Sequence, residues 1–133
     1  MKLTVPELRK EAFEITTSIK NIKKMHNYQL ELAKFDDDLS KEQGKDFAEL
    51  TKANAINMIH YLESSEAFIK EQLGLTEKEV EKLEEFGRAE FDRLTNKIIL
   101  IFQGYDESFI DRVFKEEDGA KDGEKKEQAL AKG

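Results

Sequence analysis

The chain has 133 residues, no cysteine, equal shares of hydrophobic and charged residues at 38% each, and a formal net charge of -7. This length suits one domain with a single core, and the absence of cysteine excludes disulfides and thiolate metal sites. No apolar run reaches the roughly 20 residues of a membrane span, and the first six residues lack a signal-peptide core. We therefore expect a cytosolic protein, and its acidity argues against a nucleic-acid surface.

Residues 1–17 are predicted to contain strands. Leu3–Val5 and Phe13–Thr16 each alternate apolar with polar residues, and Pro6 lies between them where it disfavours a helix. We expect two short strands that form a hairpin. A lone hairpin is marginal in water, so the strands must lie on the helices or pair with another chain.

Apolar residues at three- and four-residue steps predict a first helix over residues 22–39, capped by Thr17 or Ser18. This helix carries most of the basic residues of the chain. A solvated helix face is the favoured interpretation of these residues, and a dock for an acidic partner is the alternative. The basic residues are Lys20, Lys23, Lys24 and Lys34.

A second, longer helix is predicted over residues 47–73, after a polar linker around Gly44. Asn54 and Asn57 interrupt its apolar face, so a bend or an incomplete cover is expected there. The helix ends at a tight corner. Gly74 suits the left-handed conformation that closes a helix, and the run from Thr76 to Glu79 is typical of a capping box that starts the next helix.

After the corner, Val80, Leu83 and Phe86 are predicted to face inward. The glutamates between them are predicted to face water: Glu77, Glu79, Glu81, Glu84 and Glu85. A helix from about Arg88 is nearly apolar over residues 98–102, which predicts the centre of the core or a surface shared between subunits. Asp106 is expected to cap a last short helix that packs on one side only.

The expected fold is therefore mainly α: a bundle of about five helices with a short N-terminal β-hairpin (1–17) in a single domain over residues 1–115. Residues 116–133 contain only Leu130 as a large apolar residue and are expected to be a disordered charged tail.

No catalytic or cofactor motif is found in the sequence. It lacks a glycine-rich phosphate loop, an HExxH pair, a GxSxG elbow and a CxxC pair. Asp36–Asp38 lacks the alternate spacing and distal glutamate of a calcium loop, and His26 and His60 have no partner at ligand spacing. We expect no catalytic residues, no metal, no cofactor and no enzyme activity.

Four segments, taken in order, carry a family resemblance. They are the start MKLTV with Leu8 and AFEITT at 12–17, NIKK at 21–24 leading to YQLELA at 28–33, the corner FIKEQLGLTEKEVEKL at 68–83, and the apolar run 98–104 with Tyr105 and Asp106. Together they resemble the small tail assembly chaperones that long-tailed phages of Gram-positive bacteria encode upstream of the tape-measure gene. The polar linker around Gly44 departs from the family pattern.

The resemblance implies a protein that binds the tape-measure protein, keeps it soluble and helps tail-tube subunits polymerise around it. It implies action in the host cytoplasm, absence from the mature virion and self-association into a homo-oligomer. The acidic charge and the lack of a long apolar run predict no nucleic-acid or membrane partner. The resemblance also implies a longer frameshifted form, for which the codons of Lys125 and Lys126 are candidate slippery sites. Alternatives from other classes are an acidic DNA-mimic inhibitor and a structural adaptor of the virion.

On this reading, the client or subunit surface is predicted on the last two helices. An acidic holdase needs apolar grooves that accept amphipathic helices. The alternative is that the same residues fill the core of the monomer. The predicted surface comprises Ile98, Ile101, Phe102, Phe109, Ile110, Val113 and Phe114.

Overall fold

The computed structural model describes residues 1–40 and 46–115. A helix over residues 107–115, here called the terminal helix, follows the labelled elements. Those elements are β1 (Lys2–Leu3), β2 (Phe13–Glu14), α1 (Ile19–Ser40), α2 (Phe47–Leu73), α3 (Glu77–Glu84) and α4 (Arg88–Phe102). The predicted mainly helical fold with an N-terminal hairpin is confirmed. The linker around Gly44 and the predicted disordered tail lie outside the described residues.

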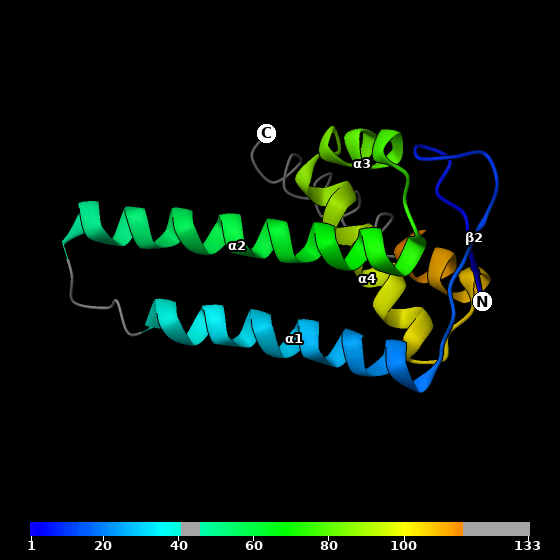
Figure 1. Ribbon diagram of the computed structural model, residues 1–133, viewed down its shortest axis with the longest axis horizontal. Helices are drawn as coiled ribbons and strands as arrows, with labels where there is room; N and C mark the ends of the chain where they lie inside the picture. Colours follow the sequence, from blue (N-terminus) through cyan, green and yellow to red (C-terminus); the bar gives the residue numbers. More distant parts are fainter. Residues whose placement is uncertain (41–45, 116–133) are drawn as a thin grey trace, which may run out of the picture.

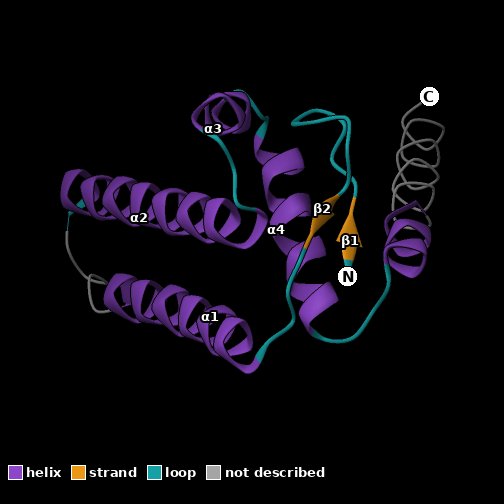
Figure 2. Cartoon of the chain, turned by 45° about the vertical axis from the view of Figure 1, so that its right-hand side comes forward, coloured by secondary structure: helices purple, strands orange, loops and turns teal. Residues whose placement is uncertain are grey.

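The helices α1 and α2 run antiparallel and project well beyond the rest of the molecule (Figure 1). The other elements gather at one end of this pair: α3 and α4 lie against α2, and the strands lie beside α4 with the terminal helix beyond them (Figure 2). The strands are antiparallel, with Leu3 opposite Phe13. We call the projecting pair of helices α1 and α2 the hairpin, as distinct from the N-terminal β-hairpin, and the rest of the molecule the body.

The caps and rings of α1 and α2 explain how the hairpin is held. The Ser18 hydroxyl accepts from the Asn21 N–H at 3.2 Å, so Ser18 and not Thr17 caps α1. Near the body, the rings of Tyr28 and Phe68 stack at 4.6 Å. Farther out, the Asn57 side chain donates to the Phe35 carbonyl at 2.8 Å, which gives the polar interruption predicted in α2 a structural role.

The predicted corner between α2 and α3 is confirmed. Gly74 has a φ of 63° and donates its N–H to the Lys70 carbonyl, which closes α2. The Thr76 hydroxyl accepts from the Glu79 N–H, and the Glu79 carboxylate accepts from the Thr76 N–H. These reciprocal bonds satisfy backbone donors that the start of a helix leaves free.

The prediction that Glu79 faces water is wrong, because its side chain joins the N-terminal segment to α3. Glu79 is only 7% exposed. Its two carboxylate oxygens accept from Nε and Nη2 of Arg9 at 2.5 Å each, and the Arg9 guanidinium lies 4.2 Å from the Phe13 ring centroid. The Arg9 hydrogen bonds, followed by the Thr76 N–H, lower the pKa of Glu79 to about 2.

The core fills the body and draws on every element in it. The helix α4 lies at its centre, as predicted for the apolar run 98–102, since Ile98 and Ile101 are fully buried. Of the ten fully buried apolar side chains among the described residues, four come from the N-terminal segment and six from the helices. The most deeply buried are Leu3, Leu8, Phe13, Ile15, Met25, Ile69, Leu83, Ile98, Ile101 and Ile110.

Replacing Glu79 by Gln should remove a pH-dependent part of the stability. A carboxylate whose pKa is lowered on folding stabilises the fold above its unfolded pKa of about 4.3 and loses that effect as pH falls toward 2. Urea unfolding between pH 7 and pH 3 should therefore show Glu79→Gln less stable at pH 7, with the difference shrinking below pH 5. Parallel curves would contradict the Arg9–Glu79 account.

The same substitution at two glycines should have opposite results. At Gly74, with φ +63°, an added Cβ meets nothing within 4 Å, so the backbone conformation alone makes Gly74→Ser cost about 1 kcal/mol. Gly87 caps α4 with φ -68°, where Gly87→Ser is neutral or stabilising because serine is a better cap. Chemical denaturation measures both, and an equal loss at the two sites would refute the conformational argument.

Candidate functional site

The surface of the described residues exposes several large apolar side chains. In the ranges 1–40 and 46–115, no three His, Asp or Glu side chains are grouped as metal ligands. Over the same ranges, no helix has the length and apolarity needed to cross a membrane. The His60 ring packs at 5.1 Å against the Phe35 ring.

The predicted partner residues separate into buried and accessible sets. Ile98, Ile101 and Ile110 are at most 1% exposed and Phe102 is 9% exposed, so these four lie in the core, as the alternative stated. On the terminal helix, Phe109 is 39% exposed, while Val113 and Phe114 are half-buried. The accessible part of the predicted surface therefore begins at Phe109.

Two aromatic rings at the start of the terminal helix form what we call the aromatic patch: Tyr105 and Phe109. The Asp106 carboxylate accepts from the Phe109 N–H at 2.8 Å and caps the helix, as predicted. The rings of Tyr105 and Phe109 stack at 4.9 Å. The guanidinium of Arg112 lies 5.9 Å from the Phe109 ring centroid, so the patch has a cationic border.

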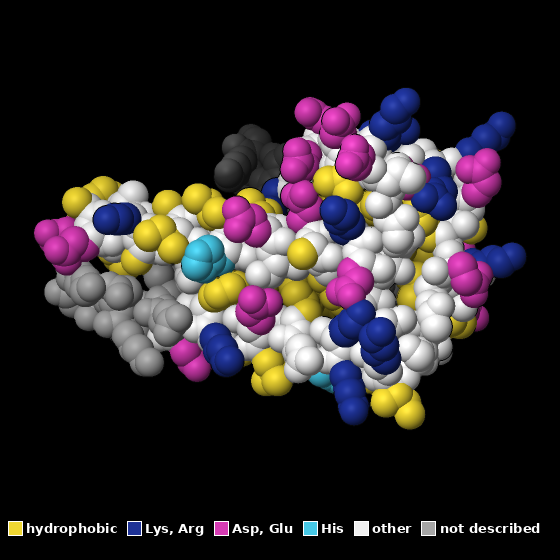
Figure 3. All heavy atoms as spheres, in the orientation of Figure 1, with side chains coloured by type: hydrophobic (Ala, Val, Ile, Leu, Met, Phe, Trp, Pro, Cys, Tyr) yellow, Lys and Arg dark blue, Asp and Glu magenta, His cyan; other side chains and the backbone are white. Residues whose placement is uncertain are grey.

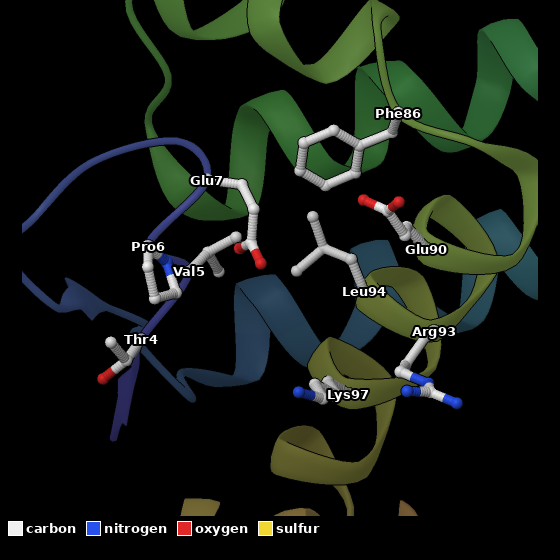
Figure 4. Close-up of a pocket in the computed structure, with 9 residues that line it drawn as sticks. All are labelled: Thr4, Val5, Pro6, Glu7, Phe86, Glu90, Arg93, Leu94 and Lys97. Atoms are coloured by element: carbon white, nitrogen blue, oxygen red, sulfur yellow. The ribbon is translucent and has the colours of Figure 1, made fainter. Parts of the chain in front are cut away.

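A cleft of about 220 Å³ opens between the N-terminal segment and α4. Figure 4 shows the Phe86 ring and Leu94 pointing between these elements, with the Glu7 carboxylate facing them. Arg93 and Lys97 come from the next turn of α4 at the edge of the cleft, and both also border the Phe114 ring. The cleft thus lies next to the Phe114 ring near the end of the terminal helix.

A second apolar surface lies on the first half of α2. Phe47 is 84% exposed, Ile59 52% and Met58 41%. Figure 3 shows apolar side chains following this half of the helix toward its free end. We call the surface the α2 stripe: Phe47, Ala48, Thr51, Ala55, Met58 and Ile59.

Sequence reasoning expected a bend or an incomplete cover of this helix at Asn54 and Asn57 but did not identify the α2 stripe. The spacing of apolar residues shows which face of a helix is apolar, but not what length of that face another helix covers. A usable signal was present: α2 is 27 residues long, whereas the two helices that follow it have only 8 and 15 residues.

A polar network borders the α2 stripe on the side of α4. The Tyr61 hydroxyl donates to Asp92 at 2.7 Å, and Arg88 Nε donates to the other Asp92 oxygen at 2.9 Å. Burial, followed by the hydrogen bond to Asp92, raises the pKa of Tyr61 to about 12. Arg88 is thus engaged within the chain and also contacts the Met58 sulfur at 3.1 Å.

Charge is distributed unevenly over the surface. Figure 3 shows acidic side chains gathered over α3 and basic ones over the body end of α1. Lys24 of this basic region pairs with Glu71 of α2. Where α2 meets α3, burial and the carboxylates of Glu84 and Glu63 raise the pKa of Glu66. This acidic cluster borders the body end of the α2 stripe.

Comparison with known proteins gives one informative result. Searches of the curated proteins and of the solved structures give no match. The model of the family described as phage tail assembly chaperone proteins, TAC, matches residues 1–119. That range spans both long helices, the corner, α4 and the terminal helix. Because the match covers most of the 133 residues, the chain belongs to the family of phage tail assembly chaperone proteins.

Proposed function

We propose that this tail assembly chaperone binds the tape-measure protein in the host cell, keeps it soluble and promotes polymerisation of tail-tube subunits around it. The chaperone then leaves, so that the mature virion lacks it. The family supports a role in phage tail assembly, and the identity of the client is our proposal. The assignment to long-tailed phages of Gram-positive bacteria and the self-association into a homo-oligomer stay predictions.

The observation that carries the proposal is the coexistence of a strong acidic charge with large apolar side chains at the surface. The net charge of -7 keeps the chain soluble, while Phe47, Ile59 and Phe109 are each at least 39% exposed. A holdase requires both properties, because it must attract an apolar helix and remain dissolved while doing so. An amphipathic client helix gains affinity by laying its apolar face on such side chains.

We place the client contact proposed from the sequence on the aromatic patch. Tyr105 and Phe109 supply large ring faces whose ordering costs little, because the rings already stack on each other. Ile110, the residue after Phe109 on the same terminal helix, is completely buried and anchors the helix to the core. The cleft between the N-terminal segment and α4 offers room for one client side chain.

The rival functions are less favoured. A DNA mimic needs regularly spaced carboxylates without cations between them, whereas Lys24 pairs with Glu71 and Lys97 with Asp111 here. A virion adaptor would be retained in purified particles. The family match favours assembly over both.

The double variant Tyr105→Ser, Phe109→Asp should lose the client and keep the fold. Both side chains are about 40% exposed, and an acidic residue is favourable in the first turn of a helix. In co-expression with the tape-measure protein of the same phage, the wild-type chain should hold this client in the soluble fraction. The variant should retain its far-ultraviolet circular dichroism and lose at least about tenfold in affinity.

Ile19→Asp is the matched control, since Ile19 is 74% exposed at the start of α1 and lies outside both apolar surfaces. It should hold the client as the wild-type chain does. If the double variant binds as before, the aromatic patch is the wrong site. If the wild-type chain itself fails to keep the tape-measure protein soluble, the proposed function is wrong.

Release of the chaperone gives an independent test. Mass spectrometry of purified phage should detect the tape-measure and tube proteins without this chain, and infected-cell lysate should contain it bound to the tape-measure protein. Stoichiometric amounts in the virion would favour the adaptor.

A further inference from the structure

Four residues of the α2 stripe, all except Phe47 and Ile59, belong to a seam that runs along the whole of α2. Residues at alternating steps of four and three lie on one side of a helix, as in the seam of a coiled coil. In α2 these positions are Ala48, Thr51, Ala55, Met58, Leu62, Ser65 and Ile69. The seam therefore has the geometry that accepts another helix over its full length.

The body covers only the second half of this seam. Ser65 and Ile69 are completely buried, and Leu62 shares a shallow pocket with Leu83 of α3 and Phe91 of α4. Toward the free end, Met58 and every earlier seam position are exposed. The same helix face thus changes from core to surface within about one turn.

The exposed half is suited to burial. Phe47, Met58 and Ile59 supply large apolar side chains, while Ala48 and Ala55 allow a second backbone to approach closely. The Thr51 hydroxyl already donates to the Phe47 carbonyl at 2.8 Å, so a partner would cover it without leaving a polar group unpaired. From Phe47 to Leu62 the seam is about 22 Å long, or about four helical turns.

The charges around the seam indicate which charges a partner helix should carry. Glu49 and Lys52 offset each other near the free end, and Arg88 is held by Asp92. At the body end, burial and then the nearby carboxylates of Glu84 and Glu63 raise the pKa of Glu66. A cation placed there by a partner would relieve the repulsion among these carboxylates.

We propose that the α2 stripe binds an amphipathic helix whose apolar seam is flanked by Lys or Arg, supplied by the client. This inference rests on the proposed function and adds a second docking surface to it. The client helix lies along residues 47–62, with its cations beside Glu63, Glu66 and Glu84. A second copy of this chain fits less well, because antiparallel pairing of two hairpins would bring the acidic residues Asp46 and Glu49 near that same cluster.

The two docking surfaces lie far apart. The α2 stripe occupies the projecting hairpin and the aromatic patch lies at the opposite end, on the terminal helix (Figure 1). One chaperone can thus contact two separated segments of a long helical client, which shields more of it than either surface alone.

The test uses the full chain and two labelled helical peptides of about 20 residues with the same Leu seam, one flanked by Lys and the other by Glu. Fluorescence anisotropy at 50 and 300 mM salt should show the Lys-flanked peptide binding at least about tenfold more tightly at low salt. The variant Ala55→Gln adds bulk to the seam without changing charge and should weaken this peptide at least about tenfold. Glu66→Gln with Glu84→Gln should weaken it and reduce its salt dependence.

Ile19→Gln is the matched control and should bind as the wild-type chain does. Equal binding of the Lys-flanked peptide by Ala55→Gln and by the wild-type chain would overturn the proposal, and so would equal affinity for the two peptides. Light scattering completes the test: a wild-type dimer that Ala55→Gln converts to a monomer would assign the stripe to a second copy. These outcomes concern the α2 stripe alone. If the wild-type chain still keeps the tape-measure protein soluble, the proposed function holds even when the stripe proposal fails.

Discussion

The helix α2 is longer than the body that packs against it, and this mismatch determines what the surface offers. Its 27 residues extend about 40 Å, whereas α3 and α4 contain 8 and 15 residues and pack mainly against its second half, with Arg88 reaching Met58. The helix α1 covers one side of the free half and leaves the seam open. Apolar residues on the part of α2 that extends past the body, such as Met58, therefore remain at the surface.

The body end is fixed by the N-terminal segment, which binds two elements that are distant in sequence. Arg9 joins it to Glu79 of α3, and the Thr4 N–H donates to Glu107 of the terminal helix at 2.6 Å. The terminal helix is thereby held against the core through Ile110 while its aromatic patch stays exposed. The aromatic patch therefore lies on the body, and the α2 stripe lies on the projecting hairpin of α1 and α2.

Local chemistry made much of the fold predictable. Gly74, Thr76, Gly87 and Asp106 act within a few residues of their own position, so the helix ends they set could be read from the sequence. Burial depends on distant partners, which explains the errors. Glu79 was assigned to water because its partner Arg9 lies 70 residues away, and the α2 stripe was not identified because nothing local shows where the body ends. The predicted site includes Phe109, which is exposed, but four of its members, including Ile98 and Ile110, lie in the core.

The central claim is that apolar surface left open on an acidic helical body shelters a client chain. Hydrogen–deuterium exchange of the chain alone and in complex with the tape-measure protein tests it most directly. The account predicts slower exchange over residues 47–62 and 105–114, with little change in α3. A complex that protects neither segment, or one in which protection appears only over the acidic face of α3, would contradict it.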